Sequence, residues 1–163
     1  MCESRKVQED RAYAALLDAP DAESHLEEFD AGVKGRGVRC VRPINVNELV
    51  CEYRGELLET TDALHREALS SGSYMFFFSV HDRGLWRGEW CLDATLTETG
   101  KGRLLNHSRL APNLRPRLLY VPGTPPRIAF FATRNIAANE ELLFDYGDDD
   151  HEAIAACPWL ATS

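Results

Sequence analysis

The chain has 163 residues, of which 44% are hydrophobic and 27% are charged, and this composition suits one folded domain with a single core. No apolar run reaches the length of a membrane helix, and Met1 begins a polar stretch and not a signal peptide. The formal net charge of −8 argues against direct nucleic-acid binding.

The acidic residues gather at the two ends of the chain. Residues 1–30 hold nine acidic against three basic side chains, and residues 140–152 hold seven acidic side chains and no Lys or Arg. Between them, residues 31–139 hold fifteen basic and ten acidic side chains. Acidic ends would suit a basic partner, such as an arginine- and lysine-rich tail. The alternative is that the acids serve only solubility.

The first predicted element is a loosely amphipathic helix over residues 4–18, which Pro20 stops. A polar link follows it. From Gly35 the pattern changes to the short strands "GVRCV", "LVCEY" and "GELLE", which Pro43 and a turn at residues 45–47 separate.

A second helix is predicted for "TTDALHREALSS", residues 60–71, with Thr61 as its N-cap and Gly72 at its end. Five further strands, rich in aromatic and β-branched residues, are "YMFFFSV", "LWRGEWCLDA", "RLLYV", "RIAFFATR" and "EELLFDY". "DDDHEAIAAC" begins a final helix, which Pro158 interrupts. Because these strands do not alternate with long helices, the predicted fold class is mainly β with short helices (α+β), and a doubly wound parallel sheet is not expected.

The cysteines are odd in number and scattered. They form no CxxC pair and no zinc-ligand spacing, so we expect reduced thiols, a cytosolic or nuclear setting and no metal. The five are Cys2, Cys40, Cys51, Cys91 and Cys157.

Four short segments could carry chemistry: "KGRG" at residues 34–37, "EYRGEL" at 52–57, "GRLLNHS" at 102–108 and "EELLFDYG" at 140–147. Taken alone, each has an ordinary explanation, such as a glycine turn, a buried core tyrosine or an edge strand that ends in core aromatics. The spacings match no P-loop and no Gly-x-Ser-x-Gly elbow, and no second histidine stands at zinc-ligand spacing.

Two of these segments leave a choice between structural and functional roles. Asn106 and His107 could hydrogen-bond a ligand or lock a crossing of the backbone. Asp145 could be a general base, but no carboxylate or histidine partner is evident for it. Tyr146 could be a core residue or could aim its hydroxyl at a pocket.

Together, in this order, the four segments resemble the SET-domain protein lysine methyltransferases, over about residues 32–146. "TDALHREAL", "YMFFF", "CLDAT" and "CPWL" are similar to the PR-Set7 type, the histone H4 lysine-twenty monomethyltransferases. The resemblance implies a fold of small β-sheets in which the "NHS" segment and the last strand form a C-terminal pseudoknot. It divides the chain into an N-terminal helical flank (1–31), a SET domain (32–147) and a C-terminal flank without a zinc site (148–163).

The resemblance also implies S-adenosylmethionine as cofactor, with S-adenosylhomocysteine as product and no metal. The substrate lysine would enter a narrow channel from the opposite side of the domain. Tyr74 would line the cofactor site near the mouth of the channel, and Trp159 would close over the adenine, unless it is only a hydrophobic plug. The other implied cofactor contacts are Lys34, Gly35, Arg36, Asn106 and His107.

For catalysis, the resemblance implies that Tyr146 places its hydroxyl near the transferring methyl group and that Tyr53 hydrogen-bonds the lysine amine. A sulfonium methyl group is already activated, so the protein must align the reactants and present a neutral amine. Strand alternation puts Phe144 on the face of Tyr146 and turns Asp145 away, which argues against Asp145 as a base.

The chain departs from this subfamily at Phe144, where the monomethylating enzymes have tyrosine. The missing hydroxyl leaves room for a methylated amine to react again, so we expect dimethylation or more.

The expected substrate is a basic protein such as a histone tail or nucleosome, and the expected location is nuclear by resemblance, with the cytoplasm as the alternative. Residues 1–30 carry only three basic side chains, so nucleosome anchoring could be weak. The alternatives are a SET enzyme that acts on non-histone lysines and a non-catalytic module that only binds cofactor or peptide.

Overall fold

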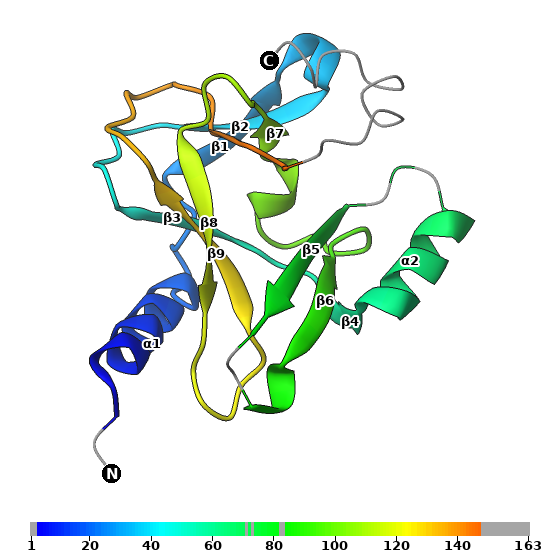
Figure 1. Cartoon of the computed structure of the whole chain (residues 1–163). Coiled ribbons are helices and arrows are strands. Elements are labelled where there is room, and N and C mark those ends of the chain that lie inside the picture. Colours follow the sequence, from blue (N-terminus) through cyan, green and yellow to red (C-terminus); the bar gives the residue numbers. More distant parts are fainter. Residues whose placement is uncertain (1–2, 71, 73, 82–83, 148–163) are drawn as a thin grey trace.

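The computed structural model describes residues 3–70, 72, 74–81 and 84–147 (Figure 1). The predicted final helix, Cys157, Trp159 and the C-terminal flank of residues 148–163 lie outside this range. Within it are two α-helices and four small sheets of two or three strands, three of them antiparallel and one parallel. The predicted fold class, mainly β with short helices, is confirmed. Neither helix is long and apolar enough to cross a membrane.

Helix α1 (Arg5–Leu17) packs on the central sheet. Its ring contact is Tyr13, which meets Phe131 edge to face at 4.9 Å between centroids. Asp10 is only 1% exposed and accepts hydrogen bonds from the Arg117 guanidinium (2.6 Å) and from a backbone N–H (3.1 Å). A buried carboxylate needs such partners. The predicted helix is therefore an integral part of the fold.

The first sheet corrects a prediction. Sequence analysis placed a polar link after the helix, but β1 (Leu26–Asp30) forms there and pairs antiparallel with β2 (Arg36–Cys40). Leu26 is buried, whereas the acids between the apolar positions lie outside and hide the strand pattern; Glu27 pairs with Arg39 at 2.9 Å. Two strands pairing across a short connection outweigh the weak strand propensity of glutamate.

The central sheet has the order β3 (Leu49–Tyr53), β9 (Arg127–Ala132), β8 (Leu114–Leu119). Its middle strand, β9, is buried along almost its whole length. Strand β8 begins three residues before the predicted "RLLYV" and contains Pro116, which is tolerated because β8 lies at the edge of the sheet.

The third sheet has the order β4 (Glu56–Glu59), β6 (Gly88–Asp93), β5 (Met75–Val80). Strand β6 begins three residues later than predicted, because a 3-10 turn, η2 (Gly84–Trp86), precedes it. Helix α2 (Thr60–Leu69) follows β4 directly.

The predicted ends of α2 were wrong. The N-cap is Glu59 and not Thr61, which already lies inside the helix, and the Glu59 side chain makes no capping hydrogen bond. The helix ends at Leu69 with Ser70 as its C-cap, so Gly72 follows the end without forming it.

The last strand lies between two distant parts of the chain. The predicted seven-residue strand shrinks to β10 (Leu143–Phe144), which pairs in parallel with β7 (Asn106–His107). On its other side the same segment bonds to β2, where the Leu142 N–H donates to the Val38 carbonyl at 2.8 Å. A last segment held between an early strand and the "NHS" segment is the arrangement that the predicted pseudoknot requires.

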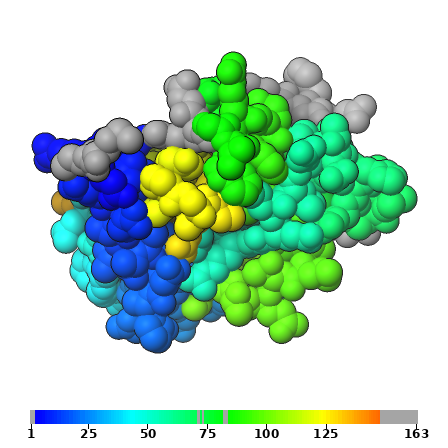
Figure 2. Space-filling model, turned by 90° about the horizontal axis from the view of Figure 1, so that it is seen from below, coloured from blue at the N-terminus to red at the C-terminus, as the bar shows by residue number. Residues whose placement is uncertain are grey.

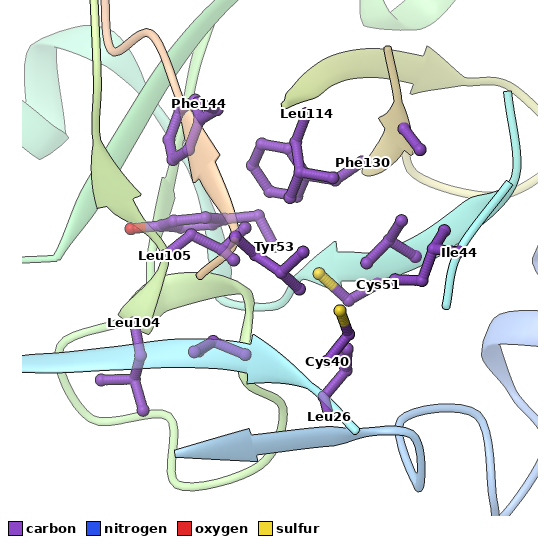
Figure 3. Packing of buried hydrophobic residues seen from close by; sticks show 14 of the residues in the cluster. Leu26, Cys40, Ile44, Cys51, Tyr53, Leu104, Leu105, Leu114, Phe130 and Phe144 are labelled. Atoms are coloured by element: carbon purple, nitrogen blue, oxygen red, sulfur yellow. The ribbon is translucent and has the colours of Figure 1, made fainter. Parts of the chain in front are cut away.

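The main core lies where these sheets meet (Figure 3). The 3-10 turn η1 (Gly32–Lys34) precedes β2, and η3 (Gly102–Leu104) leads into β7. Gly102 lies so close to β3 that a Cβ atom there would be 2.2 Å from the Glu52 carbonyl oxygen. This contact fixes η3, and with it the "NHS" segment, against the core. The described thiols Cys40, Cys51 and Cys91 are buried and free.

Candidate active site

A row of aromatic rings connects the ends of three strands. Phe76 lies 5.2 Å from Tyr53 and 6.1 Å from Phe144, centroid to centroid, and Phe144 lies 4.7 Å from Tyr146. Behind this row, Phe130 is fully buried and contacts Phe144 at 4.7 Å. The row thus brings Tyr53 from "EYRGEL" together with Phe144 and Tyr146 from "EELLFDYG".

The Tyr146 hydroxyl has a fixed direction. It donates a hydrogen bond of 2.6 Å to the Leu105 carbonyl, while the Tyr146 backbone N–H donates to Nδ1 of His107 at 3.1 Å. Burial raises the pKa of the Tyr146 hydroxyl, and the nearby Tyr74 and Glu141 raise it further. The hydroxyl therefore stays protonated at neutral pH, although 42% of the residue surface is exposed.

Asp145 points away from the aromatic row. Its Oδ1 accepts the Gly147 backbone N–H at 2.9 Å and lies 3.8 Å from Nδ1 of His107. The residue is exposed and shapes the turn after β10. No histidine partner was evident for Asp145 from the sequence, whereas the structure places His107 beside its carboxylate, so the expectation that Asp145 is not a base stays a prediction.

Tyr53 stands at the other end of the row. It is 5% exposed, and burial, with a smaller contribution from Tyr146, raises the pKa of its hydroxyl strongly. Both tyrosines are therefore neutral groups that can donate or accept hydrogen bonds. The row of aromatic rings therefore carries no formal charge at neutral pH.

The "KGRG" segment lies against the "NHS" segment. The Lys34 ammonium donates to the His107 carbonyl at 3.3 Å, and the Arg36 carbonyl accepts from the Asn106 carboxamide at 3.2 Å. Gly35 has φ +76°, which favours glycine, and no other atom lies within 4 Å of where its Cβ would be. The Arg36 side chain turns outward to Glu28 at 3.5 Å.

Asn106 and His107 are nearly fully buried, at 6% and 1% exposure. The Asn106 carboxamide nitrogen also donates to Glu141 at 3.0 Å. Because Nδ1 of His107 accepts the Tyr146 N–H, the proton of the neutral ring lies on Nε2. These contacts join the "NHS" segment to the last strand.

Tyr74 lies beside the row and is held by Arg103, whose guanidinium stacks 4.9 Å from the ring centroid. The Arg103 side chain also donates to the Ala94 carbonyl at 3.2 Å, and the Tyr74 N–H donates to the Thr95 hydroxyl at 3.2 Å. Trp159, predicted to complete this side, lies outside the described residues.

Sequence analysis missed three residues that shape the site: Phe76, Arg103 and Glu141. Phe76 is one of four aromatic residues in "YMFFFSV", and Glu141 is one of the two acids that begin "EELLFDY". Arg103 stood in a motif that was selected for its other members. Only their partners in space distinguish them.

The surroundings of the site include a large cavity. This cavity, of about 810 Å³, is lined by α1, by the segment from β3 to β4, which includes Tyr53, and by the connection from β8 to β9. Figure 2 shows the molecule from this side, with α1 in blue beside the β8–β9 connection in yellow. Among the described residues no group of three or more His, Cys, Asp or Glu side chains could hold a metal ion.

Comparison with known proteins adds three findings. The family model for the SET domain matches residues 35–147. A histone-lysine N-methyltransferase of Caenorhabditis elegans, set-1, is 40% identical over 162 residues, which cover 94% of this chain and 64% of the relative. The N-lysine methyltransferase KMT5A-A of Danio rerio is 41% identical over 95% of this chain and 44% of the relative. The chain thus spans less than two thirds of the length of these relatives.

Two solved structures are similar to this chain in fold. The SET8 protein of Cryptosporidium aligns with a TM-score of 0.65 at 29% identity, over 92% of this chain and 84% of that one. The methyltransferase domain of the human histone-lysine N-methyltransferase SETMAR aligns with a TM-score of 0.64 at 32% identity, over 75% of this chain and 44% of that one.

Proposed function

The chain belongs to the SET-domain family, and from this premise we propose that it is a protein-lysine methyltransferase that uses S-adenosylmethionine. One observation carries the proposal: the neutral Tyr146 hydroxyl, fixed on the Leu105 carbonyl, stands at the end of an aromatic row beside Asn106–His107. The relatives named as histone-lysine and N-lysine methyltransferases support the same activity.

The residues around "KGRG" and "NHS" fit such a cofactor. The molecule carries a carboxylate, an ammonium and a sulfonium, and it supplies an activated methyl group. Lys34 offers a cation at His107, Gly35 leaves open space beside its backbone, and the nearby carbonyls are acceptors for an ammonium. We propose that the cofactor contacts are Lys34, Gly35, Arg36, Tyr74, Asn106, His107 and Trp159.

The aromatic row would form the lysine channel. A lysine amine that enters between Tyr53, Phe76 and Phe144 loses water, and desolvation lowers its pKa toward the neutral form that can react. Tyr53 would accept or donate a hydrogen bond to the amine, and Tyr146 would hold the reacting groups in line.

Phe144 supports a second, finer proposal: the product is a dimethylated lysine, or a higher one. Phe144 is 4% exposed and packs against Phe130 and Tyr146, each at 4.7 Å, so its ring cannot swing away. A phenylalanine has no hydroxyl that could bind the amine or a water molecule. The space beside the ring therefore stays available to the first methyl group when the amine turns for a second transfer.

The proposed substrate is a basic protein, with a histone H4 tail first. The acidic excess of this chain suits such a partner, and the relatives named for histone-lysine methylation support it. That substrate makes the nucleus the proposed location. A peptide array that compares histone tails with other basic sequences separates this substrate from non-histone lysines.

The activity is tested by transfer of a labelled methyl group from S-adenosylmethionine to histones. We expect Tyr146→Phe to lower the rate about 100-fold or more, because removal of one fixed hydrogen-bonding group at a reacting centre costs on this scale. The thermal midpoint of the variant should stay close to that of wild type. A wild-type chain that binds cofactor and peptide without transfer would identify a non-catalytic module instead.

A further inference from the structure

One carboxylate beside the candidate active site has no role in the proposed function. Glu141 precedes the last strand, and its Oε1 accepts a hydrogen bond of 3.0 Å from the carboxamide nitrogen of Asn106. The second hydrogen of the same nitrogen goes to the Arg36 carbonyl at 3.2 Å. Because a carboxamide nitrogen has two hydrogens, Glu141 and Arg36 together fix its orientation. The Asn106 oxygen is then turned away from both acceptors.

The space around this contact is closed on one side by backbone. A Cβ atom at Gly37 would lie 2.9 Å from the Asn106 nitrogen and 3.0 Å from Oε1 of Glu141. It would also lie 3.0 Å from a ring carbon of Phe29. A side chain at position 37 would displace both polar atoms, so the glycine leaves the space in which the hydrogen bond forms.

Glu141 itself is held by its backbone. It forms an isolated antiparallel bridge with Arg39, and its carbonyl accepts from the carboxamide of the buried Asn113 at 2.7 Å. The carboxylate thus starts from a rigid segment. Its charge also reaches the other half of the site, where it adds to the effects of burial and of Tyr74 on the pKa of Tyr146.

We propose that Glu141 is a positioning residue: its carboxylate orients the Asn106 carboxamide and so leaves the Asn106 oxygen for the cofactor. This inference rests on the proposed function, because Asn106 is there a cofactor contact. The inference predicts that loss of the Glu141 carboxylate weakens the binding of the cofactor and leaves the binding of the peptide unchanged.

Two variants test the carboxylate directly. Glu141→Ala removes the acceptor, and we expect the KM for S-adenosylmethionine and the Kd for S-adenosylhomocysteine to rise about tenfold, or about 1.4 kcal/mol. The KM for the peptide should stay within about twofold of the wild-type value, because the variant is expected to change only the binding of the cofactor. Glu141→Gln keeps an oxygen acceptor, so it should recover most of the cofactor affinity.

A third variant perturbs the same contact from the other side. Gly37→Ala inserts a methyl group against both polar atoms, so it should reproduce the selective loss of cofactor affinity. The matched control is Glu27→Ala, which removes an exposed carboxylate from the neighbouring strand β1, where it pairs with Arg39. This control should change neither KM.

The outcomes separate the two proposals. A wild-type chain that binds no S-adenosylhomocysteine in calorimetry overturns the proposed function, and the inference with it. If wild type binds and Glu141→Ala binds equally well, the inference alone is overturned. The inference is also overturned if Glu141→Gln does not recover the cofactor affinity. The same holds if the KM values for cofactor and peptide rise together, because a general loss of structure would raise both.

Discussion

At the scale of single residues, Phe144 carries the proposal on the degree of methylation, because its ring has no hydroxyl group. The Phe144 ring is enclosed by Phe76, Phe130 and Tyr146, so the added oxygen of a tyrosine could not be relieved by a large ring movement. It would have to take space in the proposed lysine channel, or hold a water there.

Phe144→Tyr should therefore stop the reaction at the first methyl group. The hydroxyl would bind the amine, or a water molecule, and so block the space that the first methyl group must occupy before a second transfer. Mass spectrometry of an H4 tail peptide after long incubation reads the product directly. A variant that still forms a dimethylated peptide as readily as wild type would contradict this account of Phe144.

The sequence alone identifies candidate residues that stand in a recognisable motif, but not those whose proposed role depends on a partner. Tyr53, Tyr146, Asn106 and His107 stand in short motifs, and the structure brings them together. The role proposed for Glu141 is visible only when the last strand pairs with β7, because its partner Asn106 is 35 positions away. An acid in a strand pattern is, by itself, a solvated charge.

At the scale of elements, the strands with alternating or continuous apolar residues were predictable. The "LVCEY" strand was predicted with its observed bounds, Leu49–Tyr53. Strand β1 was missed because its acids form surface ion pairs with β2 that no local pattern reveals. Strand β10 is shorter than its strand propensity suggests, because only Leu143 and Phe144 pair with residues of β7.

Helix α1 leads to a prediction about stability. Its Asp10 is buried against Arg117, whereas its neighbour Glu9 reaches the same guanidinium from an exposed position at 3.2 Å. Arg117→Met leaves Asp10 buried without its charged partner and should lower the free energy of unfolding by roughly 3 kcal/mol. Glu9→Ala, which loses only the exposed pair, should cost less than about 1 kcal/mol. Urea denaturation measures both, and equal costs would contradict the assignment of Asp10 as the anchor.

At the scale of the whole molecule, acid should destabilise the fold in two steps. Burial lowers the pKa of His25, helped by Arg42 and Lys101 and opposed by Glu48, so the unfolded chain binds a proton more readily than the folded one. Stability should therefore fall as the pH drops below about 6.5, the ordinary pKa of histidine.

The second step belongs to carboxylates. The hydrogen bond from Arg134 lowers the pKa of Glu140 despite partial burial. Its contribution is present above the ordinary carboxyl pKa and is lost as the pH falls further. Urea denaturation at pH 7.5 and pH 5.5 isolates the first step, and His25→Asn should flatten it. An unchanged slope in that variant would assign the step to another group.

The central claim is that this SET-domain chain transfers methyl groups to a lysine of a basic protein. The most direct test is intact-mass spectrometry of histones, free and in nucleosomes, after incubation with S-adenosylmethionine and excess enzyme. We expect a gain of two methyl groups, or more, on histone H4 with wild type and no gain with Tyr146→Phe. No gain on any histone, or a gain that Tyr146→Phe leaves unchanged, would contradict it.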